Sequence, residues 1–334
     1  MENILQNVIQ HRNPDGIDHN VIRGIILHDI FDIDNPQEEN ARDNILLRPV
    51  FNLENIDDRD VKLNFRFDRD DIPRLCQALR IPELITTQSG YQATGIEGLC
   101  ILLRRLAYPN RLCDLEQVFQ RSSSALSDII NFVNTHIYDE FRHLLEDLNS
   151  LHWLNHNRLQ QYAEVIVAKG ARVPNCWGFI DGTIRPICRP SVEQEDYYSG
   201  HKRVHCVKYQ SVVTPDGITV SELGAFEGRK HDAGMFRESG FYQQLEAKAR
   251  LPNGNNFVIY GDQAYGIREL LLCPFPGHGI NEDQQNFNTS MSTLRVAVEW
   301  SFSKLVAEFA FLDFKKNKNF YYRMLKPCIR RRQY

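Results

Sequence analysis

The chain has 334 residues, of which 42% are hydrophobic and 25% charged, as is ordinary for a globular protein of one or two domains. No run of about 18 apolar residues occurs and residues 1–10 lack a secretory signal pattern, so we expect neither a membrane span nor secretion. The formal net charge of −4 is unevenly spread, because residues 1–72 hold 16 acidic and 8 basic side chains.

The eight cysteines are scattered along the sequence. None of them forms a CxxC pair, and no histidine pair follows at the spacing of a zinc site. This pattern favours reduced, mostly buried thiols in a cytosolic or nuclear protein.

Residues 1–65 are polar and rich in asparagine and aspartate, with weak hydrophobic periodicity. Turn residues interrupt them at Pro14-Asp15-Gly16 and Asn35-Pro36. We expect an acidic, loosely ordered lead-in.

Residues 66–172 have helical periodicity and predict an all-α region. Thr94 and Glu97 form a capping-box pattern, in which each side chain covers an unpaired backbone N–H, and an apolar run follows up to Pro109. Gly170 is a candidate residue just past the last helix.

A candidate helix-turn-helix lies within this region. A short helix over 114–120 precedes a break at Arg121-Ser122-Ser123, and Ser124 is a candidate cap of the next helix. Asparagine can read adenine, but Asp128 repels phosphate and no arginine or lysine accompanies it. DNA reading and plain helical packing both stay open, with packing favoured. The positions expected to be exposed are Ser127, Asp128, Asn131 and Asn134.

From residue 173 the pattern changes to mixed α/β. Runs rich in β-formers cover 176–188 and 204–213, and Pro215-Asp216-Gly217 joins the second to another at 218–226. A helix over 232–249, a short strand at 257–260 and a helix over 291–309 complete the order. We therefore expect an α/β domain over 173–314, followed by a basic tail over 315–334.

Three carboxylates occupy informative places in this domain. Asp181 lies inside the first strand, Asp262 ends a later apolar strand, and Glu299 lies among apolar residues of the last helix, where Arg295 offers an ion-pair explanation. Each acid taken alone is more simply structural or solvated. Together, three oxygen ligands suit Mg²⁺ or Mn²⁺, and two such ions can promote phosphoryl transfer.

Five stretches occur in an order that resembles the PIF/Harbinger branch of DDE transposases and the nucleases derived from it. This resemblance runs from about Cys176 to Lys318, and after Lys318 the family pattern fades, which leaves a truncated or eroded C-terminus open. The stretches are residues 178–183 (GFIDGT), 198–205 (YSGHKRVH), 228–232 (GRKHD), 260–266 (GDQAYG preceded by Tyr260) and 291–300 (MSTLRVAVEW).

The resemblance implies an RNase H-like catalytic domain, with a mixed sheet flanked by helices, after the all-α region. It places the catalytic and metal-binding triad on Asp181, Asp262 and Glu299, with 36 residues (263–298) between the last two. It implies two Mg²⁺ or Mn²⁺ ions, cleavage of DNA by water, and joining of 3′-OH ends to target DNA. A Myb/SANT-like DNA-binding partner, a homodimer and a nuclear location are further expectations from it.

Basic residues near the presumed site are candidates for contacts with DNA phosphates, with a solvated surface as the alternative. His231 and Asp232 open the helix over 232–249, where Asp232 as its N-cap is the simpler interpretation and an auxiliary role beside the metals the other. His152 and His156 lack a third ligand for a metal. The basic candidates are Lys202, Arg203, Lys208, Arg229 and Lys230.

Two functions follow as hypotheses. The first is a divalent-metal-dependent DNA endonuclease or transposase. The second is a domesticated, catalytically inactive DNA- or protein-binding factor that retains the transposase fold.

Overall fold

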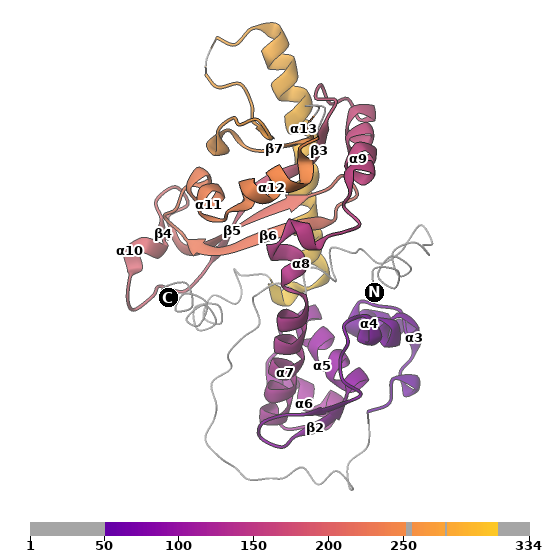
Figure 1. The fold of residues 1–334 in the computed structure, drawn as a ribbon. Helices are drawn as coiled ribbons and strands as arrows, with labels where there is room; N and C mark the ends of the chain where they lie inside the picture. Colours follow the sequence, from indigo (N-terminus) through magenta and orange to yellow (C-terminus); the bar gives the residue numbers. More distant parts are fainter. Residues whose placement is uncertain (1–50, 252–255, 278, 313–334) are drawn as a thin grey trace. The chain divides into compact units, whose positions relative to one another are not determined.

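The computed structural model describes residues 51–251, 256–277 and 279–312, with the side chains of 297–302 outside this description. The described residues form two compact units, one of 51–142 with 305–312 and one within 143–304 (Figure 1). The lead-in expected before residue 51 and the basic tail expected over 315–334 lie outside the described residues. None of the described helices is long and apolar enough to cross a membrane.

The first unit is helical and is built around one central helix. Helix α5 buries Ile101, Leu102 and Leu103 completely, and α3, α4, α7 and η4 all pack against it. A short hairpin of two antiparallel strands, which we did not predict, precedes α5. The elements are η1 (Leu53–Asn55), α3 (Asp58–Phe65), α4 (Asp71–Ala78), β1 (Leu84–Thr86), β2 (Gln92–Thr94), α5 (Gly95–Ala107), α6 (Leu112–Phe119), α7 (Ser123–Phe141) and η4 (Ala310–Leu312).

The end of the expected loose lead-in is an ordered helix. Asp57 caps α3 by accepting from the backbone N–H of Arg59 at 2.9 Å, and Val61 and Phe65 are buried. Because these apolar side chains pack toward α5, residues 51–65 belong to the helical unit. The acidic composition concealed this short amphipathic helix.

The candidate recognition helix is buried on the face that we expected to be exposed. Ser127 and Asn134 are buried, and Asp128 and Asn131 are half-buried, because α7 packs against both α5 and α6. Its cap is Ser122, whose Oγ accepts from the backbone N–H of Ala125 at 3.3 Å, and not Ser124. The burial favours the packing interpretation, since groove-reading side chains must be accessible.

A buried ion pair replaces one half of the predicted capping box. The backbone N–H of Glu97 donates to Thr94 Oγ1 at 3.2 Å, as expected for the cap. The Glu97 carboxylate instead accepts two bonds from Arg121, from Nε at 2.6 Å and from Nη2 at 2.8 Å. Arg121 Nη2 also donates to the backbone oxygen of Gln92 at 2.7 Å, so the pair links α5, β2 and the turn before α7.

The second unit contains a six-stranded mixed sheet, which confirms the α/β prediction. Strands β6, β5 and β3 are antiparallel neighbours, whereas β3, β7 and β8 run parallel, and β4 pairs with the start of β5. The strands are β3 (Cys176–Pro186), β4 (Tyr198–Ser199), β5 (Val204–Val213), β6 (Thr219–Glu227), β7 (Val258–Tyr260) and β8 (Leu271–Leu272).

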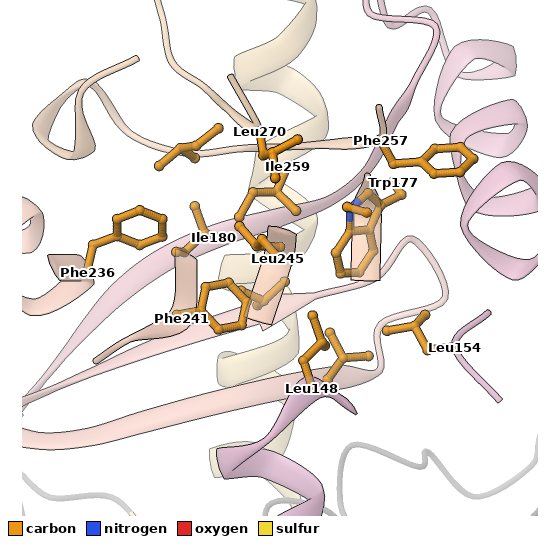
Figure 2. Packing of buried hydrophobic residues seen from close by; sticks show 14 of the residues in the cluster. Leu148, Leu154, Trp177, Ile180, Phe236, Phe241, Leu245, Phe257, Ile259 and Leu270 are labelled. Atoms are coloured by element: carbon orange, nitrogen blue, oxygen red, sulfur yellow. The ribbon is translucent and has the colours of Figure 1, made fainter. Parts of the chain in front are cut away.

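Helices cover both faces of this sheet. On one face Ile180 and Trp177 pack with side chains of α11 and α12, among them Phe236, Phe241 and Leu245 (Figure 2). On the other face, residues of β3 and β7 pack with α9 and α13. The helices of this unit are α8 (His143–Glu146), η2 (Leu148–Ser150), α9 (His156–Ala168), α10 (Gln194–Tyr197), α11 (Asp232–Glu238), α12 (Phe241–Ala249), η3 (Gln263–Tyr265) and α13 (Glu282–Glu308) up to residue 304, after which the first unit resumes.

Two boundaries differ from the sequence expectation. The helix expected over 232–249 is two helices, because Gly240 adopts a left-handed φ of 66° between them. The boundary between the two units lies at 142/143, whereas we expected 172/173. The reason is that α9 packs against β3, so its helical pattern belongs with the sheet.

Candidate active site

The register of two parallel strands places Asp181 beside Asp262. Phe179 of β3 pairs with Tyr260 of β7, and each acid comes two residues after its paired residue. The two carboxylates therefore lie at the same level of neighbouring chain segments, at the carboxyl end of β7, where ligand sites of α/β sheets gather. Asp262 is exposed, and the side chain of Asp181 is 19% exposed.

Asp181 is held by its own strand and by α13. Its Oδ1 accepts from the backbone N–H of Gly182 at 3.0 Å and lies 3.1 Å from Arg295 Nη1. Arg295 was considered as a partner of Glu299, yet its described ion pair is with Asp181. Glu299 follows Arg295 by about one helical turn in α13, and its side chain lies outside the described residues.

Asp262 begins the turn that carries Tyr265. It is the N-cap of η3, and its Oδ1 accepts from the backbone N–H of Gln263. Tyr265 ends this short 3-10 turn, and its ring lies edge-on to Phe236 of α11 with centroids 5.9 Å apart. The aromatic contact fixes the ring, since both residues are buried.

The charges of three carboxylates act on the Tyr265 hydroxyl. Burial raises the pKa of Tyr265 well above its usual range, and the charges of Asp232, Asp181 and Asp262 raise it further. Negative charge favours the neutral phenol, so all three acids act on one buried group. Asp232 therefore lies within electrostatic reach of Asp262 and of the Tyr265 hydroxyl, although the described acids are not close enough together to hold a metal by themselves.

Asp232 is not the N-cap of its helix, so the simpler sequence interpretation was wrong. The N-cap of α11 is His231, which makes no side-chain capping bond, and Asp232 is the first helical residue. Asp232 Oδ1 instead lies 4.0 Å from Lys208 Nζ. Burial raises the pKa of Asp232, the charge of Asp262 adds to this, and the charges of Lys208 and His231 oppose it.

Gly182 permits Asp232 and Tyr265 to approach the strand closely. A Cβ atom at position 182 would lie 3.2 Å from Asp232 Oδ1 and 3.5 Å from the Tyr265 hydroxyl. The first distance is tight for a carbon, so a side chain here would push the acid away. The glycine directly after Asp181 therefore indicates, in the sequence, that other groups approach the strand closely at this position.

The five basic candidates separate into paired and unpaired groups. Arg229 is paired with Asp196 at 2.9 Å, and Lys230 with Glu227 at 2.7 Å and with Glu238. Lys208 donates to the backbone oxygen of Lys230 at 2.6 Å, beside Asp232. These three are engaged within the sheet unit and are weaker candidates for DNA contacts.

Lys202 and Arg203 are the remaining basic candidates. Both are exposed in the turn between β4 and β5, and within the described part of the chain neither takes part in an ion pair. Their backbone N–H groups are held by Ser199, by Oγ at 3.5 Å for Lys202 and by the carbonyl oxygen at 2.7 Å for Arg203. A fixed backbone with free cationic side chains suits contact with phosphate.

The donor set fits a hard divalent cation. The groups brought together are carboxylate oxygens with the Tyr265 hydroxyl, whereas His156 contacts the backbone oxygen of Lys248 at 3.1 Å and packs on Phe257. Among the described side chains, no three of the histidine, cysteine, aspartate and glutamate type are close enough to hold a metal. The third predicted ligand, Glu299, has its side chain outside that set. Oxygen donors of this kind are those that Mg²⁺ and Mn²⁺ prefer.

A comparison with known families adds to this geometry. The profile of the DDE superfamily endonuclease family matches residues 180–330, which include Asp181, Asp262 and Glu299. Residues 180–330 are therefore similar to the DDE superfamily endonuclease family. This family implies an RNase H-like fold, which agrees with the observed mixed sheet flanked by helices.

Two relatives extend this result. The chain is 24% identical over 259 residues to "Protein ALP1-like" of Arabidopsis thaliana, which covers 72% of this chain and 61% of that protein. It is 27% identical over 120 residues to a probable transposase for insertion sequence element IS702 of Microchaete diplosiphon, which covers 36% of this chain and 42% of that protein. The chain thus spans less than two thirds of either relative. No solved structure matches the chain significantly.

Proposed function

We propose that this protein is a divalent-metal-dependent DNA endonuclease of the DDE transposase type. The observation that carries the proposal is the parallel register of β3 and β7, which places Asp181 and Asp262 side by side inside an endonuclease domain. Arg295 contacts Asp181 from α13, and Glu299 is one turn further along that helix. This arrangement supports Asp181, Asp262 and Glu299 as the three acidic ligands.

In this proposal, Asp181, Asp262 and Glu299 bind two Mg²⁺ or Mn²⁺ ions. Bound at these acids, the ions would activate a water molecule or a 3′-OH and stabilise the leaving oxygen of the phosphodiester. Three carboxylates leave a pair of divalent ions with one positive charge, so the DNA phosphate completes the charge balance. Lys202 and Arg203 contact the DNA backbone without reading its sequence.

The finer parts of the proposal rest on the PIF/Harbinger resemblance. They are the recognition of transposon ends, the joining of 3′-OH ends to target DNA, a Myb/SANT-like partner for specific binding, a homodimer and a nuclear location. The burial of the α7 face supports a separate DNA-reading partner, because this chain's own candidate recognition helix is covered.

A second candidate is a domesticated, catalytically inactive DNA- or protein-binding factor with the same fold. The ion pair between Arg295 and Asp181 favours it, because a guanidinium already neutralises one of the acids without a metal. In that case the acids serve as structural partners and not as ligands.

The deciding experiment is the nicking of supercoiled plasmid in Mn²⁺ by the full chain. Asp181→Asn, Asp262→Asn and Glu299→Gln would be assayed beside the wild type, with circular dichroism to verify folding. Nicking by the wild type but by none of the variants would support the nuclease. A folded wild type that leaves the plasmid intact, also with terminal-repeat DNA and a Myb/SANT-like partner, would favour the binding factor.

A further inference from the structure

The Tyr265 hydroxyl is buried without a hydrogen-bond partner among the described residues. The residue is 2% exposed, and none of the described residues offers its oxygen a donor or acceptor within bonding distance. Leaving a buried hydroxyl unpaired costs about 1–3 kcal/mol. A phenylalanine would avoid this cost and would keep the edge-on contact with Phe236. We therefore expect this hydroxyl to form a hydrogen bond in a different state of the site.

A second buried polar side chain lies on the same face of the sheet. Gln210 of β5 is 1% exposed, and neither its amide nitrogen nor its amide oxygen has a partner in the described part of the chain. It is paired across the ladder with Gly182, and it is two residues from Lys208. Alternate strand residues share a face, so Gln210 lies on the face of Lys208 and Asp232.

Asp232 lies among these groups. Its Oδ1 is 4.0 Å from Lys208 Nζ, and both Asp232 and the Tyr265 hydroxyl lie within 3.5 Å of the Cβ position of Gly182. Lys208 lies near Asp232 and Arg295 pairs with Asp181, so among the described residues two cations face the three carboxylates and Asp262 has no ion-pair partner. The region around Gly182 thus combines one unbalanced negative charge with unpaired hydrogen-bonding groups, and a bound cation would balance that charge.

We propose that Asp232 is a fourth acidic residue of the cation site and that the Tyr265 hydroxyl positions the acids around it. This inference rests on the proposed function, because it concerns the same cations. Asp232 contributes negative charge from α11, on the side of the sheet opposite the α13 helix. The Tyr265 O–H donates to a carboxylate and so leaves the other oxygens of the acids available to a cation.

The test is the binding of Mn²⁺ to the full chain without DNA, measured by isothermal titration calorimetry. Asp232→Asn and Tyr265→Phe are expected to weaken binding by about tenfold, as is usual when the outer partners of metal ligands are removed. Asp283→Asn, exposed at the start of α13, and Tyr242→Phe, which also packs on Phe236, are the matched controls and should bind as the wild type does.

Stability separates positioning from a merely structural role. Tyr265→Phe removes a hydroxyl that has no described partner, so its thermal unfolding midpoint should equal or exceed that of the wild type. A lower midpoint together with unchanged Mn²⁺ binding would overturn the positioning role. If Asp232→Asn does not fold, Asp232→Ser would take its place in the titration.

Asp181→Asn and Asp262→Asn distinguish a failure of the proposed function from a failure of the roles proposed for Asp232 and Tyr265. If these two lose Mn²⁺ binding while Asp232→Asn and Tyr265→Phe keep it, the further inference is wrong and the proposed function stands. If none of the four changes binding, the proposed function fails as well. Weakened binding in all four supports both.

Discussion

Arg295 Nη1 lies 3.1 Å from Asp181 Oδ1, so a side chain of α13 neutralises one of the predicted metal ligands. A cation that binds at Asp181 must compete with this guanidinium or share the oxygen with it. Both side chains are about one-fifth exposed, so water still screens the pair, and ion pairs that water screens contribute up to about 1 kcal/mol. We therefore expect Arg295→Gln to tighten Mn²⁺ binding by roughly two- to fivefold in a calorimetric titration.

The control for this change is Arg172→Gln, which removes an exposed arginine before β3. It has no described ion pair with an acid of the site and should leave Mn²⁺ affinity unchanged. Weaker Mn²⁺ binding by Arg295→Gln would contradict competition and would show that the arginine holds Asp181 in its binding position.

The turn between β4 and β5 should carry the electrostatic contact with DNA. The double variant Lys202→Gln/Arg203→Gln is expected to lower the affinity for a fluorescently labelled DNA duplex. The slope of log affinity against log salt concentration should also become shallower by about two, because two phosphate contacts are lost. Anisotropy titrations at several NaCl concentrations, in an Asp181→Asn background that prevents cleavage, would measure both quantities.

Arg229→Gln/Lys230→Gln removes the same amount of charge and is the matched comparison. Both of these side chains already have acidic partners in the fold, so the loss of affinity should be smaller. An equal loss in the two double variants would mean that the turn has no special role.

Runs rich in β-forming residues were sufficient to predict most of the sheet. The strand over 204–213 was predicted with its observed bounds, and the turn at Pro215-Asp216-Gly217 joins two antiparallel strands as expected. The helix over 232–249 was predicted as continuous, because the glycine at 240 only acts as a break once its left-handed φ is known. The hairpin of β1 and β2 was missed, since three-residue strands carry little alternation.

The site was predictable only in part, for a physical reason. Asp181 stands in β3 and Asp262 comes two residues after β7, and the parallel register of these strands, whose positions are visible in the sequence, brings the two acids together. Tyr265 and Gln210 escaped notice, because an unpaired buried polar group is a property of the packed fold. The pairing of Arg229 with Asp196 is likewise set by tertiary contacts, which no spacing rule describes.

Gly228 should tolerate no side chain. A Cβ atom there would lie 2.3 Å from the backbone oxygen of Tyr197 and 2.6 Å from that of Cys206, and a backbone cannot yield as a side chain can. We expect Gly228→Ala to lower the free energy of unfolding by about 1–3 kcal/mol. Gly200→Ala is the control, because its Cβ would meet nothing within 4 Å. Urea denaturation of both would decide, and equal stability would refute the steric argument.

Cys113 should be the reactive thiol among the described cysteines. It is exposed, Cys188 is half-buried, and the others are buried. Burial raises the pKa of Cys76, Cys206 and Cys273 to about 11, so few thiolates form at neutral pH. In native protein, Ellman's reagent should lose its fast phase in Cys113→Ser. A Cys328→Ser background removes the one cysteine outside the described residues, and a persistent fast phase would contradict the burial of the others.

The ion pair between Glu97 and Arg121 should be the most sensitive point of the helical unit. The guanidinium is fully buried and the carboxylate side chain is 6% exposed, so removing one partner leaves an uncompensated charge in the core. We expect Arg121→Ala to lower the free energy of unfolding by about 3–5 kcal/mol in urea. The double variant Glu97→Leu/Arg121→Met should recover most of that loss, because apolar side chains of similar size avoid the unpaired charge. A double variant as unstable as Arg121→Ala would instead place the cost in the lost bond from Arg121 to the backbone of Gln92.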